Sequence, residues 1–197
     1  MSRGQIVTAA SLTEYFREAL DAALKHEALH PNEATSSYLV QLLCEFAENK
    51  TQDLKQPLAM ILARANFSSS TEESVSRLKQ VGDQSLYVAG FFGESLVRLK
   101  LDLEYYVTMG EVAYRRLSSL MKRLSEESRL TVVFTELGRK FPNFVQVLSE
   151  VKHQGGFDFS MEDLGELYQE WQKTGSKTIA AKLKALGMVL PSKKTSD

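Results

Sequence analysis

The spacing of apolar residues predicts a chain built from helices. It is clearest over residues 103–124, where apolar or small side chains recur at alternating intervals of three and four. The positions are Leu103, Tyr106, Gly110, Ala113, Leu117, Leu120 and Leu124. Such a seam is typical of a helix that packs lengthwise against another helix. Gly110 and Ala113 are small at neighbouring seam positions, which allows the second helix to cross closely.

The same periodicity, together with caps and breakers, predicts further helices along the chain. Their approximate ranges are 12–29, 34–48, 57–65, 127–137, 142–153, 160–174 and 176–186, with another helix that begins at Ser70. The helix over 34–48 is apolar around most of its circumference, which is typical of a central helix. No segment alternates cleanly between apolar and polar residues, so no strand is predicted. We therefore expect an all-α fold, a compact bundle of about eight helices.

Two adjacent glycines, Gly155 and Gly156, divide the predicted fold into two parts. Residues 1–154 are expected to form the helical core domain. Residues 155–197 are expected to form a C-terminal helical segment packed on that core, because their helices are short and follow the glycine pair. The polar tail after Pro191 is expected to fray.

Residues 82–114 are rich in both glycine and aromatic side chains. They hold six of the chain's 18 aromatic residues and four of its 11 glycines. Glycine weakens a helix by roughly 1 kcal/mol relative to alanine, so four glycines indicate close approach of a backbone, a ligand or a partner. The predicted ligand or partner site consists of Tyr87, Gly90, Phe91, Phe92, Tyr106, Gly110 and Tyr114. We also expect the region of Gly90 and Gly93 to cross the helix that carries Gly110.

The helix that begins at Ser70 meets Gly82 and Asp83 after three turns. It either continues to about Gly90 or kinks at this point. If it kinks, Asp83 and Ser85 are expected to cap the helix that follows, since both residue types are common at helix starts. The alternative is that these two residues, with Glu94 and Ser95, turn polar groups toward an aromatic hollow that holds a small ligand.

Composition narrows the class of protein. The 197 residues carry 24 basic and 25 acidic side chains and are 43% hydrophobic, as in an ordinary globular protein. A single cysteine, Cys44, forms no internal disulfide and is expected to be a core residue. The longest apolar run has seven residues, far short of the roughly 20 that span a membrane. We expect a soluble cytoplasmic protein with no membrane contact.

Two histidine motifs indicate a possible metal site. Residues 26–30 read His-Glu-Ala-Leu-His, which matches the HExxH pattern of zinc peptidases. The pair Glu27 and His30 is repeated by Glu150 and His153, the Glu-x-x-His spacing of di-iron helical bundles. Both second histidines stand at expected helix ends, where a histidine is favoured by the helix dipole alone. A zinc or di-iron enzyme is therefore an alternative hypothesis, and no cofactor is predicted.

Other chemistry has little support in the sequence. Neither a nucleophile elbow nor a phosphate-binding loop occurs. Basic residues gather at residues 115–116 and 122–123 and in the lysine-rich end of the chain. They are not interleaved with aromatic residues in a nucleic-acid-binding motif, so nucleic-acid binding is not favoured.

Part of the chain resembles a family of bacterial all-helical proteins. The likeness rests on the run Gly-Asp-Gln-Ser-Leu-Tyr-Val-Ala-Gly-Phe-Phe at 82–92 and on Tyr-Tyr-x-x-Met-Gly-x-x-Ala-Tyr at 105–114. The segment Tyr-Leu-Val-x-Leu-Leu at 38–43 is similar too, so the resemblance covers about residues 38–118. It implies a bacterial origin. It brings no activity, cofactor or catalytic residue.

The sequence therefore favours a non-enzymatic interaction or adaptor module that binds a protein partner. The partner surface would be the glycine and aromatic region or the basic terminal helix. A small-ligand protein that uses Tyr87, Phe91, Phe92 and Tyr106 is the first alternative, and the metalloenzyme is the second. The seam over 103–124 is expected to form either part of the core or the interface of a homodimer.

Overall fold

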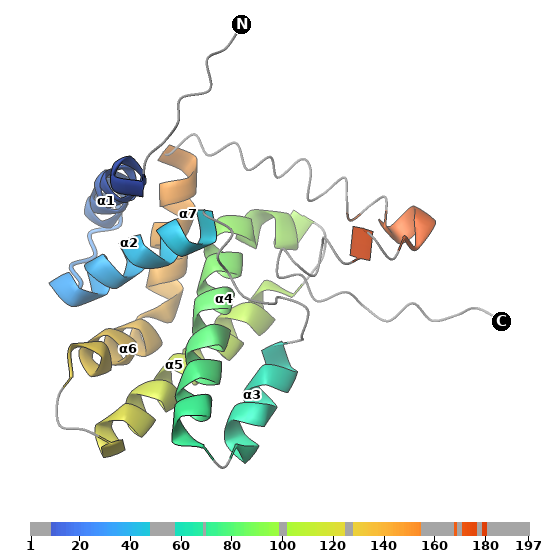
Figure 1. Ribbon diagram of the computed structural model, residues 1–197. Coiled ribbons are helices and arrows are strands. Elements are labelled where there is room, and N and C mark those ends of the chain that lie inside the picture. The colour runs from blue at the N-terminus through green and yellow to red at the C-terminus, as the bar shows by residue number, and fades with distance from the viewer. Residues whose placement is uncertain are drawn as a thin grey trace, which may run out of the picture.

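The computed structural model describes residues 9–47, 58–68, 70–98, 102–124, 128–154, 168, 171–176 and 179–180. Seven helices have defined bounds in this part of the chain. They are α1 (Ala9–His26), α2 (Glu33–Ala47), α3 (Leu58–Phe67), α4 (Thr71–Arg98), α5 (Leu103–Leu124), α6 (Arg129–Arg139) and α7 (Phe141–Gln154). No described residue lies in a strand, and helical residues recur at 168, 171–174 and 179–180. The all-α prediction is confirmed (Figure 1).

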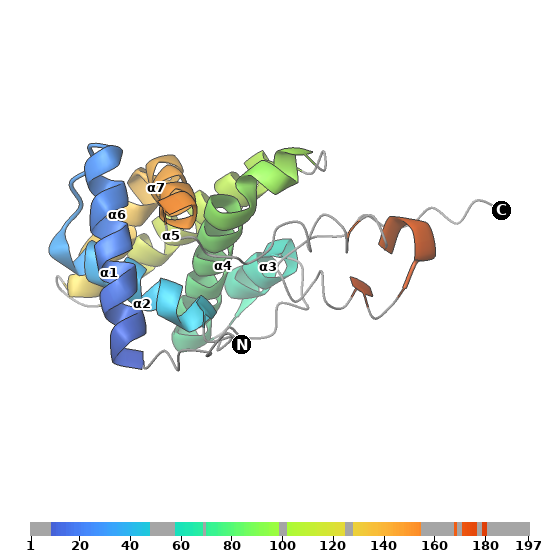
Figure 2. The same cartoon turned by 90° about the horizontal axis from the view of Figure 1, so that it is seen from above.

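Helix α4 is the centre of the bundle. Of its 28 residues 16 are buried, and it packs against α3, α5 and α7. Both views place it between α3 and the group formed by α1, α6 and α7 (Figures 1 and 2). The helix runs without a break through Gly82 to Arg98, so of the two alternatives the helix continues, and the caps at Asp83 and Ser85 that a kink would have required do not form. The two polar residues are instead buried in mid-helix.

Three of the four glycines of α4 and α5, at positions 82, 90 and 110, are explained by close contacts between helices. A Cβ atom added at Gly110 would lie 2.5 Å from Cε2 of Phe141 on α7 and 2.8 Å from Cβ of Ser85 on α4. One added at Gly90 would lie 2.5 Å from Cβ of Leu148 on α7. The close crossing of α4 and α5 was therefore predicted correctly, but not its residues. Gly110 meets Ser85 rather than Gly90, because Gly90 faces α7.

The seam of α5 is used within the chain. Tyr106, Gly110, Ala113 and Leu117 are buried, and α5 packs on α4 and α6. The described structure thus assigns this seam to the core rather than to a homodimer interface. Only its last residue, Leu124, is well exposed.

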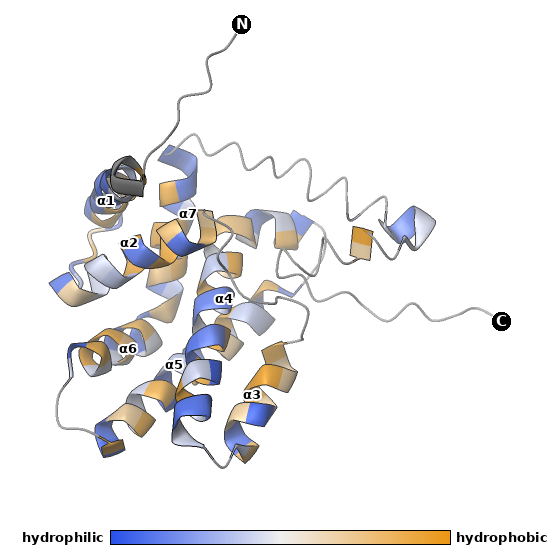
Figure 3. Cartoon of the chain, in the orientation of Figure 1, coloured by the Kyte–Doolittle hydropathy of each residue, from blue (hydrophilic) through white to orange (hydrophobic). Residues whose placement is uncertain are grey.

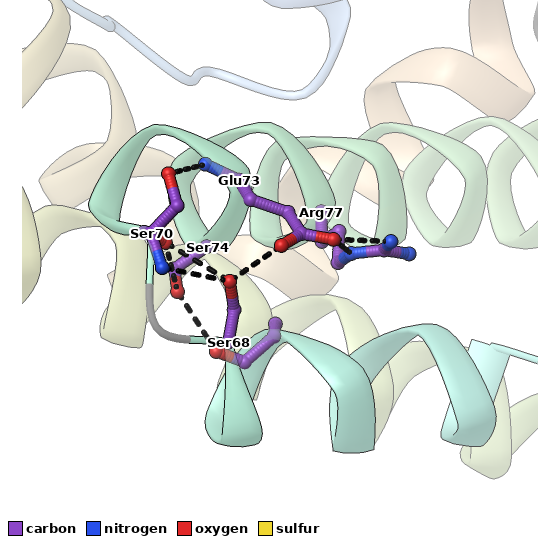
Figure 4. A network of polar contacts seen from close by, with 6 residues as sticks. Ser68, Ser70, Glu73, Ser74 and Arg77 are labelled. Atoms are coloured by element: carbon purple, nitrogen blue, oxygen red, sulfur yellow. Dashed lines mark hydrogen bonds and ion pairs between the residues drawn. The ribbon is translucent and has the colours of Figure 1, made fainter.

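Polar caps fix the start of α4, where Ser70 and Glu73 have the spacing of a capping box (Figure 4). The backbone N–H of Glu73 donates to Oγ of Ser70 at 3.3 Å, as expected for a capping box. The Glu73 carboxylate does not return to the Ser70 backbone. It accepts instead from the Ser68 hydroxyl at 2.6 Å, and Ser68 Oγ accepts from the Ser70 N–H at 3.1 Å. The Ser68 hydroxyl thus bridges the Ser70 N–H and the Glu73 carboxylate, which would bond directly in a capping box.

A second polar contact joins α6 to the start of α2. Oε2 of Glu136 accepts hydrogen bonds from the backbone N–H of Asn32 at 2.8 Å and from the buried Thr35 hydroxyl at 2.9 Å. Its other oxygen accepts from Nζ of Lys140 at 2.9 Å. Partial burial raises the pKa of Glu136, but these hydrogen bonds outweigh it, and the pKa lies below its ordinary value. A carboxylate from one helix therefore caps the N-terminus of another.

We expect Glu136→Gln to lower the free energy of unfolding by about 1 kcal/mol at neutral pH, because hydrogen bonds to the charged group are weakened. A depressed pKa stabilises the fold above the ordinary value of 4.5, and this contribution is lost as the pH falls through the folded-state pKa. The deficit of the variant relative to wild type should therefore shrink between pH 7 and pH 4 in urea unfolding. A deficit that does not change with pH would contradict the role assigned to the charge.

In the described part of the C-terminal segment, one helix ends and the next begins where the sequence predicts, near residues 174 and 176. Gly175 has a positive φ of 66° and its N–H donates to the Trp171 carbonyl at 2.8 Å, as at the end of a helix. Ser176 Oγ accepts from the N–H of Ile179 at 3.4 Å, which marks the start of the next. Tyr168 and Trp171 are buried with the main core. The predicted domain boundary at residue 155 lies outside the described residues.

None of the described helices combines the length and apolar character needed to cross a membrane.

Candidate functional site

A buried carboxylate stands at the junction of α2, α4 and α5. Asp83 on α4 accepts hydrogen bonds at Oδ1 from the hydroxyls of Tyr38 on α2 and Tyr114 on α5, each at 2.6 Å. Its Oδ2 accepts from Nζ of Lys79, one turn earlier on α4, at 2.5 Å. Side chains from three helices thus meet on one carboxylate.

Burial sets the electrostatics of this network. Burial has the largest influence on the Asp83 carboxyl and raises its pKa. Lys79 and the two phenols lower the pKa, but they do not outweigh the burial. Burial and the neighbouring carboxylate both raise the pKa of Tyr38 and of Tyr114 above the ordinary value. Both phenols therefore remain protonated donors near neutral pH. Each carboxylate oxygen already accepts a hydrogen bond, so the arrangement suits a clamp between helices better than a general base.

Neighbouring rings hold the two phenols in place. Tyr114 is fully buried and stacks on Phe134 of α6 with ring centroids 5.6 Å apart. Tyr38 meets the same ring edge-on at 5.3 Å. Nζ of Lys79 lies 5.4 Å from the centre of the Tyr38 ring, within cation–π range. Each member of the network therefore makes two or more contacts.

Two surface hollows meet above this network. The α2–α6 hollow, of about 530 Å³, is lined by Asn32, Glu33, Ala34, Ser37, Tyr38, Gln41, Arg129, Leu130 and Val133. The α4–α5 hollow, of about 610 Å³, is lined by Thr71, Glu72, Val75, Ser76, Lys79 and Leu124. Tyr38 lines the first and Lys79 the second, and Nζ of Lys79 lies 5.4 Å from the centre of the Tyr38 ring. We call this pair the ridge between the hollows. We call the two hollows together the concave face.

The edge of the concave face carries exposed apolar side chains. Leu124 ends α5 and is 56% exposed, and Leu130 in the first turn of α6 is 47% exposed. Each lines one of the two hollows. Figure 3 shows hydrophobic colour at these two helix ends, whereas the front of the first half of α4 is largely hydrophilic.

The residues predicted to bind a ligand or partner lie mostly in the interior. Six of the seven are buried, and Tyr87 is half-buried. Tyr87 stacks on Phe46 of α2 at 3.8 Å and on Phe91 at 4.9 Å, while Phe92 meets it edge-on. Tyr106 belongs to a separate apolar cluster with Leu58 and Ile61. The rings thus fill space between helices, and a binding role for them would require the core to open.

The polar groups expected beside this aromatic region do not converge. Asp83 contacts α2 and α5, whereas the exposed Glu94 lies near α7, with Oε1 3.3 Å from Nε2 of His153 and Oε2 3.7 Å from Nζ of Lys152. Ser85 is buried against Gly110, and its hydroxyl has no hydrogen-bond partner among the described residues.

The HExxH pattern does not form a helical zinc motif. Helix α1 ends at His26, where the N–H of Leu29 donates to the Leu24 carbonyl and that of Ala28 to the Lys25 carbonyl. This is a Schellman ending, with Ala28 at a positive φ of 49°. His30 lies beyond the helix, so the two histidines do not share a helix face. The expectation that the first helix continues to residue 29 is wrong for the same reason.

The structure nevertheless brings together three of the five predicted metal-site residues. Nδ1 of His26 lies 3.1 Å from Oε1 of Glu27 and 3.9 Å from Oε1 of Glu150 on α7. His153, one turn from Glu150, is directed elsewhere: its Nδ1 lies 2.8 Å from the Ser149 carbonyl and its Nε2 near Glu94. The paired Glu-x-x-His motifs therefore do not face each other across a bundle interior.

The network residues Tyr38 and Lys79 were missed as site residues by sequence reasoning. Lys79 and Asp83 have the i, i+4 spacing of an ion pair on a helix, and this was the only local signal. The contact between Tyr38 and Asp83 spans 45 positions and has no local signature.

Comparison with known proteins finds no family model that matches the chain. No curated protein and no solved structure matches it either.

Proposed function

We propose that this protein is a cytoplasmic interaction module that binds an amphipathic helix of a protein partner on its concave face. The observation that carries the proposal is the pair of adjoining hollows, each with an exposed leucine at its edge. Apolar anchors on one face of a helix commonly fill such hollows. The earlier expectation of an adaptor is retained, but its surface is moved away from the buried glycine and aromatic region.

The ridge between the two hollows supports this role. Tyr38 and Lys79 are tied to Asp83, so the ridge between the hollows is held by the core rather than by mobile side chains. A preorganised surface loses less conformational entropy when a partner binds. The Asp83 network thus serves binding indirectly, by holding α2, α4 and α5 at fixed separations.

Charge at the edge favours an acidic flank on the partner helix. Lys122, Arg123 and Arg129 are exposed beside the two leucines, and among the described residues none has a carboxylate within ion-pair distance. Glu126 and Glu127, which follow Leu124 in the sequence, lie outside the described residues. Electrostatic complementarity at such a rim acts chiefly on association rate and specificity.

The proposal is tested with a fluorescein-labelled synthetic peptide of about 18 residues, long enough for five helical turns. It carries leucines on one helical face and glutamates on the other, and a matched peptide has lysines in place of the glutamates. Fluorescence polarisation should show saturable binding of the acidic peptide that weakens as salt is added. Equal binding of both peptides, or preferential binding of duplex DNA, would overturn the proposal.

Two variants locate the binding. Leu130→Asp should weaken binding of the acidic peptide at least tenfold, about 1.4 kcal/mol, because it places a charge in the α2–α6 hollow. The matched control is Val97→Asp, the same kind of change at a residue that is 62% exposed near the other end of α4. Val97→Asp should leave binding unchanged. If the two variants behave alike, the peptide does not bind at the concave face.

A further inference from the structure

We propose that His26, Glu27 and Glu150 form a binding site for a divalent transition-metal ion such as zinc, where α1 and α7 end. Their three nearest ligand atoms, one from each side chain, all lie within 4.8 Å of one another. One imidazole nitrogen and two carboxylate oxygens are a donor set that zinc accepts. None of these three residues lines either hollow of the concave face, and the two proposals stand independently.

The way α1 ends creates the first half of the site. In the Schellman ending the helix stops at His26, and Glu27 is its flanking residue, with its N–H still bonded to the Ala23 carbonyl at 2.9 Å. Two adjacent side chains on a regular helix diverge by 100°. Here Oε1 of Glu27 returns to within 3.1 Å of Nδ1 of His26. These two side chains thus lie together at the end of α1, although the HExxH motif as a whole is broken.

The last turn of α7 supplies the second half. Glu150 is only 22% exposed, and Nε2 of Gln154 donates to its Oε1 at 2.5 Å. Gln154 therefore donates to the same oxygen that lies 3.9 Å from Nδ1 of His26, and it orients the carboxylate as a second layer of hydrogen bonds does in metal sites. Packing of α1 against α7 then sets the separation of the ligands.

The electrostatic setting favours a cation. The described C-terminal ends of α1 and α7 both lie here, and each helix C-terminus carries roughly half a negative charge. Two carboxylates add to this charge. His26 is 62% exposed on its side chain, so an ion can reach the ring and solvent can complete its coordination. An imidazole ligand favours zinc, copper, nickel or cobalt over magnesium and calcium, which prefer oxygen ligands alone.

The neighbouring histidine provides an internal control. Nδ1 of His153 is 2.8 Å from the Ser149 carbonyl, and its Nε2 lies 3.3 Å from Glu94, a carboxylate outside the proposed set. Like His26, His153 is exposed and stands in the last turn of its helix. A general affinity of surface histidines for metals would involve both rings, whereas the proposed site involves only His26.

The test is isothermal titration of the full chain with zinc chloride after removal of metal by a chelator. Binding of one ion per chain is expected, and His26→Gln and Glu150→Gln should each weaken it at least tenfold. His153→Gln should have no effect. Circular dichroism verifies that the exposed positions can be changed without loss of helix. An absence of saturable binding, or equal affinities of wild type and His26→Gln, would overturn the proposal.

Cobalt adds a readout of the ligands themselves. Visible absorption of the cobalt-loaded protein should show bands that His26→Gln removes and His153→Gln preserves. Excess magnesium should not displace the ion. Bands that survive His26→Gln would place the metal elsewhere and contradict the assignment.

Discussion

Gly110→Ala is expected to destabilise the fold by about 3 kcal/mol, the upper part of the range for overpacked cores. The added methyl group would overlap the ring of Phe141 and approach Cβ of Ser85 to 2.8 Å. Phe141 is fully buried, so its ring has no solvent-filled space to enter. Helices α4, α5 and α7 would have to separate. Urea unfolding followed by circular dichroism measures the loss.

The matched control for this prediction is Gly93→Ala, another helical glycine in the same bundle. A Cβ at Gly93 would lie 3.6 Å from the nearest atom of Leu103, an ordinary van der Waals contact. Alanine is the better helix former, so this variant should be unchanged or more stable by up to about 1 kcal/mol. Equal destabilisation by both changes would contradict the packing described for α4 and α5.

Asp83→Ala is expected to lower the free energy of unfolding by about 3–5 kcal/mol, because a buried hydroxyl left without its acceptor costs about 1–3 kcal/mol and the change affects two of them. The change leaves the hydroxyls of Tyr38 and Tyr114 without their acceptor and Lys79 without its ion-pair partner. Thermal and urea unfolding both measure this loss. The peptide used for the concave face should bind Asp83→Ala more weakly even where the variant remains folded, because the ridge between the hollows is no longer held.

Variants of the other network members should lower the free energy of unfolding less than Asp83→Ala does. Tyr38→Phe and Tyr114→Phe each remove one donor from a carboxylate that keeps its other donors, at about 1–2 kcal/mol each. Lys79→Met should be mildest, since the Lys79 side chain is 40% exposed. A smaller loss for Asp83→Ala than for either tyrosine variant would show that the carboxylate is not the centre of the network.

The sequence predicted those elements whose signals are local. The bounds of α5 agree with the predicted 103–124, because its apolar period is unbroken and its ends are clear. Whether α4 continues or kinks at Gly82 was left open, because the intrinsic helix propensity of glycine does not decide between the two. In the structure the missing side chain of Gly82 accommodates the ring of Tyr114, and this tertiary contact outweighs propensity.

The candidate sites were less predictable for a related reason. Richness in glycine and aromatic residues indicates close packing, but it does not distinguish packing within the chain from packing on a partner. The Asp83 network depends on Tyr38 and Tyr114, which are 45 and 31 positions away. The end of α1 was missed because a Schellman ending usually carries glycine at the position that Ala28 occupies.

The proposed helix-binding face is tested most directly by ¹H–¹⁵N NMR spectra of the labelled protein during titration with the acidic peptide. The account predicts that shift changes concentrate at the two hollows, on α2 near Tyr38, at Leu124 and in the first turn of α6 at Leu130. The region of Val97 should remain unchanged. Changes centred on α1 and α7, or none at a saturating peptide concentration, would contradict the assignment of the concave face.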